Sequence, residues 1–344
     1  MNTIIGIIII AFGSMGQSSS YVPIKKVKNW SWESFWLTQG IFAWLVFPYL
    51  GALLAVPESS SLSLILSSGS GASLKALGYG MLWGVGGLTF GLSMRYLGVA
   101  LGQSIALGTC SAFGTLIPAM LMGTDLFTGK GLILLIGVCI AIAGIAIIGY
   151  AGSLRSKNMT AEQQKAAIKD FALGKGLLVA LLAGVMSACF SLGLSAGEPI
   201  KETVLSLGTQ ALFAGLPVIL MVTVGGFITN ATYCIFQNIK NKTIKEYISV
   251  PGSVLVNNLL FCALAGVLWY SQFFGLALGK SFFVEGSIMM AFSWSILMSL
   301  NILFSNVWGI ILKEWVGSKR ATFVWLAAGL AVLIFSCVFP SLAQ

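Results

Sequence analysis

Long apolar segments separated by short polar ones run through the whole chain. Ten of these segments are long enough for a helix that crosses the hydrocarbon core of a membrane, which takes about 20 residues. They cover residues 4–22, 34–56, 75–94, 98–122, 131–152, 175–196, 208–236, 254–278, 286–311 and 322–342. None alternates with the period of two that a β-barrel strand needs, so the pattern predicts an all-α integral membrane fold. The stretch 57–73, rich in serine, is expected to be a flexible loop on the outer side.

Positive residues are distributed unevenly among the loops between these segments. Fifteen of the 19 lysines and arginines lie in odd-numbered loops. Because cytoplasmic loops attract lysine and arginine, the odd loops are expected inside the cell and both termini outside it. The first loop opens on "KKVKNWSWESFW" (25–36), whose lysines would anchor it in the cytoplasm. Its Trp30, Trp32 and Trp36 are typical of a belt at the membrane interface.

The two halves of the chain share a motif. "GMLWGVGGLTFGL" (80–92) and "GVLWYSQFFGL" (266–276) both read Gly-x-Leu-Trp followed by Phe-Gly-Leu. A polar linker, 153–174, separates a first half, 1–152, from a second half, 175–344. Because each half holds five spans, the second must have the opposite orientation. The sequence therefore predicts ten transmembrane helices arranged as two inverted five-helix repeats, an architecture common in secondary transporters.

The composition excludes several classes of function. The net charge of +9 is explained by the loops, so no nucleic-acid partner is expected. The chain has no histidine and no Cys/His cluster, so we expect no metal site, and without a GxxxxGK[ST] loop we expect no nucleotide or other cofactor. Transport driven by an ion gradient remains, and we expect that the protein is not an enzyme. An integral-membrane enzyme acting on lipid or glycan is the alternative from another class.

Polar and aromatic residues inside the spans are the candidates for binding a substrate, because polar groups in lipid should face the bundle interior or a cavity. Two tryptophans occupy matching places in the shared motif, and several amides interrupt apolar segments. Aromatic rings stack on the C–H faces of sugars, and amides bond their hydroxyl groups, so this set favours a neutral, polyhydroxylated substrate. The candidates are Gln17, Trp83, Gln103, Trp269, Gln272 and Asn301.

Coupling to protons would need a carboxylate whose protonation follows the conformational cycle. Glu285, which borders the ninth segment on the outer side, is the first candidate. Glu33 is the second. It follows Ser31, a good N-cap residue, so stabilising the first turn of a helix is its alternative role.

Several longer motifs resemble those of the L-rhamnose–proton symporter family, a branch of the drug/metabolite transporter superfamily. They are "PIKKVKNWSWESFW", "GMLWGVGGLTFGLSMRYLG" continuing into "ALGQSIALG", "WYSQFF" and "GIILKEW". The resemblance implies two inverted five-helix repeats in a bacterial inner membrane. It also implies uptake of L-rhamnose or a related 6-deoxyhexose with protons. The expected partners are the sugar, the co-transported proton and membrane lipids. An exporter or a carrier of another neutral metabolite is the alternative. The sequence leaves the oligomeric state open.

Overall fold

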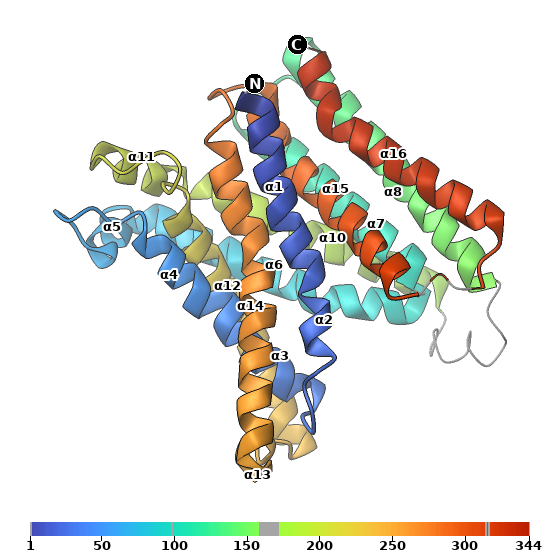
Figure 1. Ribbon diagram of the computed structural model, residues 1–344. Coiled ribbons are helices and arrows are strands. Elements are labelled where there is room, and N and C mark those ends of the chain that lie inside the picture. Colours follow the sequence, from blue (N-terminus) through green and yellow to red (C-terminus); the bar gives the residue numbers. More distant parts are fainter. Residues whose placement is uncertain (1, 98, 158–171, 314, 316, 344) are drawn as a thin grey trace. The chain divides into compact units, whose positions relative to one another are not determined.

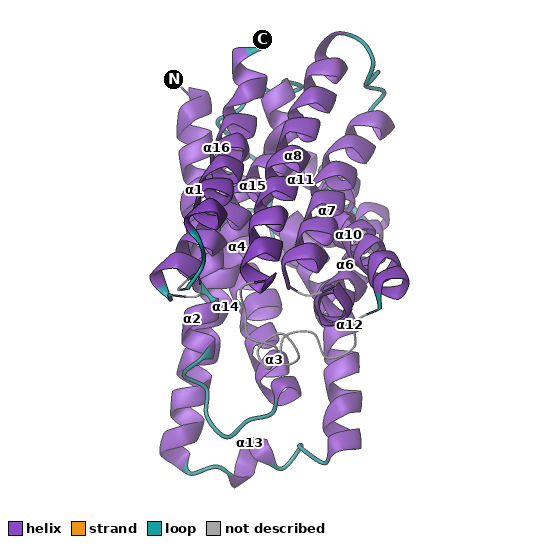
Figure 2. Ribbon diagram, turned by 90° about the vertical axis from the view of Figure 1, so that its right-hand side faces the viewer, coloured by secondary structure: helices purple, strands orange, loops and turns teal. Residues whose placement is uncertain are grey.

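The computed structural model describes residues 2–97, 99–157, 172–313, 315 and 317–343, and its regular structure is helical (Figures 1 and 2). No strand occurs within those ranges. Eight helices of the described chain are long and apolar enough to cross a membrane. They are Trp32–Leu53, Gly102–Leu121, Gly129–Lys157, Leu173–Ser206, Leu216–Asn241, Gly252–Lys280, Ile288–Ile311 and Arg320–Leu342. The chain is therefore a multi-pass membrane protein.

Each of the ten predicted segments overlaps a helix, but two of these helices are not among the eight. Helix α1 (Asn2–Ser19) is short, with an apolar part of only Thr3–Ser19. Helix α6 (Ser70–Leu97) has 28 residues, but glycines and aromatic residues interrupt its apolar run, which lowers its hydropathy. Within the described residues, the structure therefore shows eight candidate membrane spans, and the predicted ten are not confirmed.

The chain forms two compact units, and each takes segments from both halves of the sequence. Unit 1 comprises the described residues of Met1–Ile7, Val85–Leu192 and Phe282–Gln344. Unit 2 comprises Ile8–Gly84 and Gly193–Ser281. Helices α1, α6 and α10 (Leu173–Ala196) contribute to both. The predicted linker 153–174 lies largely outside the described residues.

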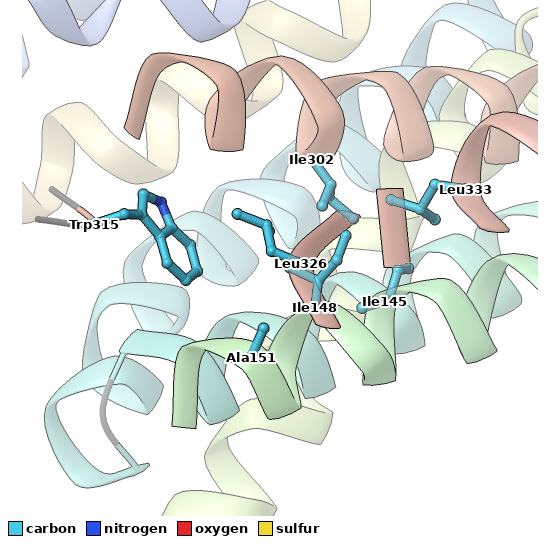
Figure 3. Close-up of a cluster of buried hydrophobic side chains, with 7 residues drawn as sticks. All are labelled: Ile145, Ile148, Ala151, Ile302, Trp315, Leu326 and Leu333. Carbon is cyan, nitrogen blue, oxygen red and sulfur yellow. The ribbon is translucent and has the colours of Figure 1, made fainter. Parts of the chain in front are cut away.

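Unit 1 is built mainly from α7 (Val99–Leu121), α8 (Gly129–Lys157), α15 (Ile288–Ile311) and α16 (Arg320–Leu342), which pack against one another. Apolar side chains from three of these helices, together with Trp315, form a buried cluster (Figure 3). The cluster consists of Ile145, Ile148, Ala151, Ile302, Trp315, Leu326 and Leu333. The apolar stripes of α8, α15 and α16 are thereby buried together.

Unit 2 contains a continuous helical segment that changes its winding in the middle. Helix α3 (Trp32–Gly40) continues through a π-helical turn, η1 (Ile41–Val46), into α4 (Phe47–Leu53). The Phe47 amide donates to the carbonyl of Phe42, five residues earlier, as a π-helix requires. Such π-turns are frequent at functional sites. The segment packs against α12 (Leu216–Asn241) and α14 (Gly252–Lys280), and α14 also contacts α2 (Tyr21–Ile24).

Two short helices correct the expectation of a flexible loop over 57–73. Helix α5 (Leu62–Ser68) is capped by Ser61, whose hydroxyl accepts the Leu64 amide, and it packs on α11 (Glu198–Ser206). Ile65 of α5 is fully buried in a cluster with Ile200 and Val204 of α11. The prediction was wrong here because the leucines and isoleucine between the serines give a short apolar face with a partner far away in sequence.

The remaining boundaries follow local signals. Helix α12 begins at Leu216, later than the predicted 208, and Pro217 lies in its first turn, where a missing N–H costs nothing. It ends at Asn241, and the C-cap residue that follows, Lys242, adopts a left-handed conformation. The short helix α13 (Glu246–Ser249) then leads into α14.

Candidate functional site

Five aromatic residues of unit 2 meet in what we call the aromatic cluster: Trp36, Trp44, Trp83, Trp269 and Phe273. They come from α3, η1, α6 and α14. The ring centroids of Trp83 and Trp269 are 5.7 Å apart. Trp44 lies edge-on to both, at 6.0 and 5.8 Å. The two tryptophans at matching places in the repeated motif are thus in contact.

Helix α12 packs against the cluster and supports it. The ring of Trp83 lies so close to Gly226 that a side chain at this position would overlap it. Trp36 donates its indole N–H to Oδ1 of Asn230 at 3.0 Å. The Asn230 amide in turn donates to the Gly226 carbonyl at 2.9 Å. Trp36 was expected in an interfacial belt. In the structure it is half-buried, and its indole N–H is hydrogen-bonded to Asn230 of α12.

Besides Ser60 Oγ, which lies before α5, four buried polar atoms of unit 2 have no hydrogen-bond partner among the described residues. They are Ser14 Oγ, Gln39 Oε1, Trp44 Nε1 and Tyr270 Oη, which we call the unpaired atoms. The side chains of Gln39, Trp44 and Tyr270 are 1%, 3% and 5% exposed. Leaving such a group without a partner costs about 1–3 kcal/mol, so native proteins do so rarely, and an unpaired group calls for a functional explanation.

The sequence did not single out Trp44 or Tyr270. In an apolar span, an aromatic residue that binds a ligand has the same pattern as one that packs in the core. A π-helical turn also has no sequence signal that would have marked Trp44. The nearest indication was the adjacent motif residue Trp269, which precedes Tyr270 in α14.

The other predicted binding residues are divided between the units. Gln272 is buried in α14, and its amide donates to the carbonyl of Trp269 at 3.2 Å. Gln17 is half-buried in α1, in unit 2. Gln103 in α7 and Asn301 in α15 are half-buried in unit 1. The structure thus places four of the six candidates, including both tryptophans, in unit 2.

Glu33 is a buried carboxylate, only 7% exposed, in the first turn of α3. The prediction that Ser31 caps this helix is confirmed, since its hydroxyl accepts the Ser34 amide at 3.4 Å. Oε1 of Glu33 accepts hydrogen bonds from the Asn241 amide at 2.9 Å and the Thr243 hydroxyl at 3.0 Å. Both donors are neutral, and both lie at the end of α12, so Glu33 joins α3 to α12.

Further hydrogen bonds extend this contact into what we call the Glu33 network. Oε2 of Glu246 accepts the Ser31 amide at 2.7 Å, and the Glu246 carbonyl accepts the Trp30 indole at 3.0 Å. Asn258 bonds both backbone groups of Lys28, at 2.9 and 2.7 Å. The network consists of Lys28, Trp30, Ser31, Glu33, Ser34, Asn238, Asn241, Thr243, Glu246, Tyr247 and Asn258.

Asn238 lies at the centre of the network. It is buried, and its Oδ1 accepts the Ser34 hydroxyl at 3.0 Å. The Thr243 hydroxyl, which has one proton, lies 2.9 Å from this Oδ1 and 3.0 Å from Oε1 of Glu33, so the two acceptors share it. Its amide donates to the Cys234 carbonyl and, at 3.3 Å, to the Tyr247 hydroxyl. Burial raises the pKa of Tyr247, so its hydroxyl stays protonated at neutral pH. The side-chain groups that Asn238 bonds are therefore neutral.

The two predicted coupling carboxylates differ in their surroundings. Glu285 is exposed, in the turn that joins α14 to α15. Glu33 is buried and held by two hydrogen bonds. A carboxylate enclosed in this way responds to a conformational change more strongly than one already in contact with solvent.

Comparisons with known proteins identify the family of the chain. Residues 1–343 match the model of the L-rhamnose-proton symport protein (RhaT) family. The chain is 35% identical to an L-rhamnose-proton symporter of Yersinia pestis (strain Pestoides F), over 97% of this chain and 96% of the relative. The L-rhamnose-proton symporter of Yersinia pseudotuberculosis serotype O:1b (strain IP 31758) gives the same values. The chain belongs to the L-rhamnose-proton symporter family.

Proposed function

We propose that this protein takes up L-rhamnose, or a closely related 6-deoxyhexose, together with protons by alternating access. Membership of a symporter family supports transport rather than an enzymatic reaction. The observation that carries the proposal is the contact between Trp83 and Trp269 inside the aromatic cluster. Both rings are half-buried and come from matching motifs of the two halves.

The sugar would bind at the aromatic cluster. Small-molecule sites are mostly apolar and aromatic, with a few polar groups that fix the orientation. Tryptophan rings would stack on the C–H faces and the methyl group of a 6-deoxyhexose. Gln272 and Gln17 of unit 2 are the polar partners proposed for this cluster. Gln103 and Asn301, which belong to unit 1, stay predicted substrate-binding residues.

The proposed architecture has ten spans in two inverted repeats, 1–152 and 175–344, joined by the linker 153–174. We place the protein in a bacterial inner membrane with both termini on the periplasmic side. The distribution of positive charge supports this orientation. The composition of the units supports the repeat, because each unit draws a segment from either half.

We assign proton coupling to Glu33, with Glu285 as the second candidate. Burial supports Glu33, because a change of protonation there would alter contacts between α3 and α12. Its neutral donors support the same choice, since protonation would not break an ion pair with Asn241 or Thr243. Under the proposed orientation, the first loop and the loop after α12 are both cytoplasmic. Glu33 would therefore exchange protons with the cytoplasm.

Uptake of labelled L-rhamnose into energised membrane vesicles tests the proposal. We expect accumulation that collapses when a protonophore removes the proton gradient. Absence of rhamnose uptake in vesicles that contain folded protein would contradict the assignment of the substrate. Uptake that is insensitive to the protonophore would contradict only the coupling.

The same vesicles separate the two carboxylates. Glu33→Gln keeps a carbonyl oxygen that can accept from Asn241 and Thr243, so it should fold. We expect it to lose accumulation while rhamnose exchange across the membrane continues. The matched variant Glu285→Gln should keep both. The reverse result would transfer the coupling role to Glu285.

A further inference from the structure

We propose that Gln39, Trp44 and Tyr270 form the hydrogen-bonding part of the sugar site and read the positions of its hydroxyl groups. The inference deepens the proposed function and rests on it, because it takes a polyhydroxylated sugar as the ligand. None of these residues is among the six binding residues predicted from the sequence, although Gln39 is a polar residue within a predicted span. Their common property is a buried polar atom without a partner in the described chain.

The three residues lie on elements that pack together. Gln39 and Trp44 belong to the continuous segment of α3 and η1, and η1 packs against α14, which carries Tyr270. The Tyr270 hydroxyl reaches α4 on that same segment, where it lies against Gly51 so closely that a side chain there would overlap it. Trp44 contacts the ring of Trp269, the neighbour of Tyr270. The unpaired atoms of these three residues are thus carried by elements that also form the aromatic cluster.

Other polar side chains of the same region do have hydrogen-bond partners. An unpaired polar atom is therefore not a general property of unit 2. Trp36 donates to Asn230, and Gln272 donates to the carbonyl of Trp269. Trp44 contacts the rings of both Trp36 and Trp269 and is more deeply buried than Trp36. Local packing therefore provides an acceptor for the Trp36 indole and leaves the Trp44 indole without one in the described chain.

The chemistry of the unpaired atoms matches that of a sugar. The indole N–H only donates, the Gln39 carbonyl oxygen only accepts, and the Tyr270 hydroxyl does both. A sugar hydroxyl can donate and accept, so each of these atoms can bond one hydroxyl. The tryptophan faces of the cluster would take the apolar C–H faces. A site that bonds hydroxyl groups with buried atoms also rejects analogues that lack them, because the atom is then left without a partner.

Two conservative variants test the inference. Trp44→Phe and Tyr270→Phe each remove one unpaired atom and keep an aromatic ring. Since the atom has no partner in the described chain, its removal should leave the Tm of the sugar-free protein unchanged or raise it. The KM for L-rhamnose uptake should rise about 3- to 10-fold in each variant, the usual effect of losing one hydrogen bond.

Trp36→Phe is the matched control, because it makes the same exchange at an indole that has a partner. It leaves Oδ1 of Asn230 without the indole N–H, so its Tm should fall. A deoxy analogue of L-rhamnose sharpens the assignment. The analogue that lacks the hydroxyl bonded by Trp44 should lose affinity in the wild type and lose no more in Trp44→Phe, a non-additive result.

The inference requires both readouts. A KM that stays at the wild-type value in Trp44→Phe and Tyr270→Phe would overturn it, and so would a lower Tm in both, which would mark the atoms as structural. Either result leaves the proposed function intact as long as the wild type transports rhamnose. If the wild type neither binds nor transports L-rhamnose, the proposed function itself fails.

Discussion

The Glu33 network and the aromatic cluster lie in the same unit, and both involve α3, α14 and contacts with α12. They differ in whether their buried polar groups are hydrogen-bonded. In the network, the buried hydroxyl of Ser34 donates to Asn238, and the buried amide of Asn258 bonds both backbone groups of Lys28. In the cluster, Trp44 buries an indole N–H that has no partner in the described chain, and Gln39 of α3 likewise buries a carbonyl oxygen without one.

The difference separates polar groups that hold helices together from those that are available to a ligand. The network lies at the start of α3, the end of α12 and the start of α14, so its bonds fasten three helix ends. The cluster lies further along α3 and in the middle of α14, where the membrane offers no water to replace a missing partner. Fully paired networks rigidify, whereas an unpaired buried group raises the free energy until a ligand bonds it.

The largest effect on stability is expected from Asn238→Leu. The substitution removes the acceptor of the fully buried Ser34 hydroxyl and one of the two acceptors of the half-buried Thr243 hydroxyl, and it removes the buried amide itself. We expect the free energy of unfolding to fall by about 2–4 kcal/mol, seen as a Tm several degrees lower in detergent. Gln237→Leu, one position earlier, is the matched control. Its amide bonds only the exposed Tyr233 hydroxyl, and its Tm should stay close to that of the wild type. Equal losses in the two variants would contradict a special role of the network.

A smaller effect on the free energy of unfolding is expected when either of two fully buried serines is replaced. Ser14 belongs to the unpaired atoms, whereas Ser34 donates to Asn238. Ser34→Ala should cost about 1 kcal/mol, and Ser14→Ala should cost nothing or stabilise slightly. Thermal unfolding of the two variants side by side checks this. A loss in Ser14→Ala as large as that in Ser34→Ala would show that the distinction between paired and unpaired atoms has no energetic consequence.

Much of the fold was predictable because apolar length decides where a membrane helix forms. A helix overlaps every predicted segment, and the shared motif indicated that Trp83 and Trp269 are equivalent. The positions of α5 and α11 were not predictable in the same way, since each is stabilised by the other across a long sequence separation. The π-turn at 41–46 depends on how α3 and α4 pack on α12 and α14, which the local sequence does not specify.

The candidate site was predictable only in part. An amide side chain is conspicuous in an apolar segment, because placing it in lipid without hydrogen-bond partners costs free energy. Gln272 and Gln17 were identified in this way. The Glu33 network was largely hidden, since Asn238 and Asn258 look like ordinary residues near helix ends. Trp44 and Tyr270 were hidden for the opposite reason. Their environment, and not their residue type, distinguishes them from core aromatics, and an unpaired atom can be recognised only from the packed structure.

A structure of the protein with L-rhamnose bound tests the central claim most directly. The account predicts the sugar against the rings of Trp83 and Trp269, with hydroxyl groups about 3 Å from Trp44 Nε1 and Tyr270 Oη. It also predicts that the bonds between Glu33 and Asn241 differ from those in the sugar-free protein when Glu33 is protonated. A sugar bound away from the aromatic cluster, with Trp44 Nε1 and Tyr270 Oη still unpaired, would contradict the account.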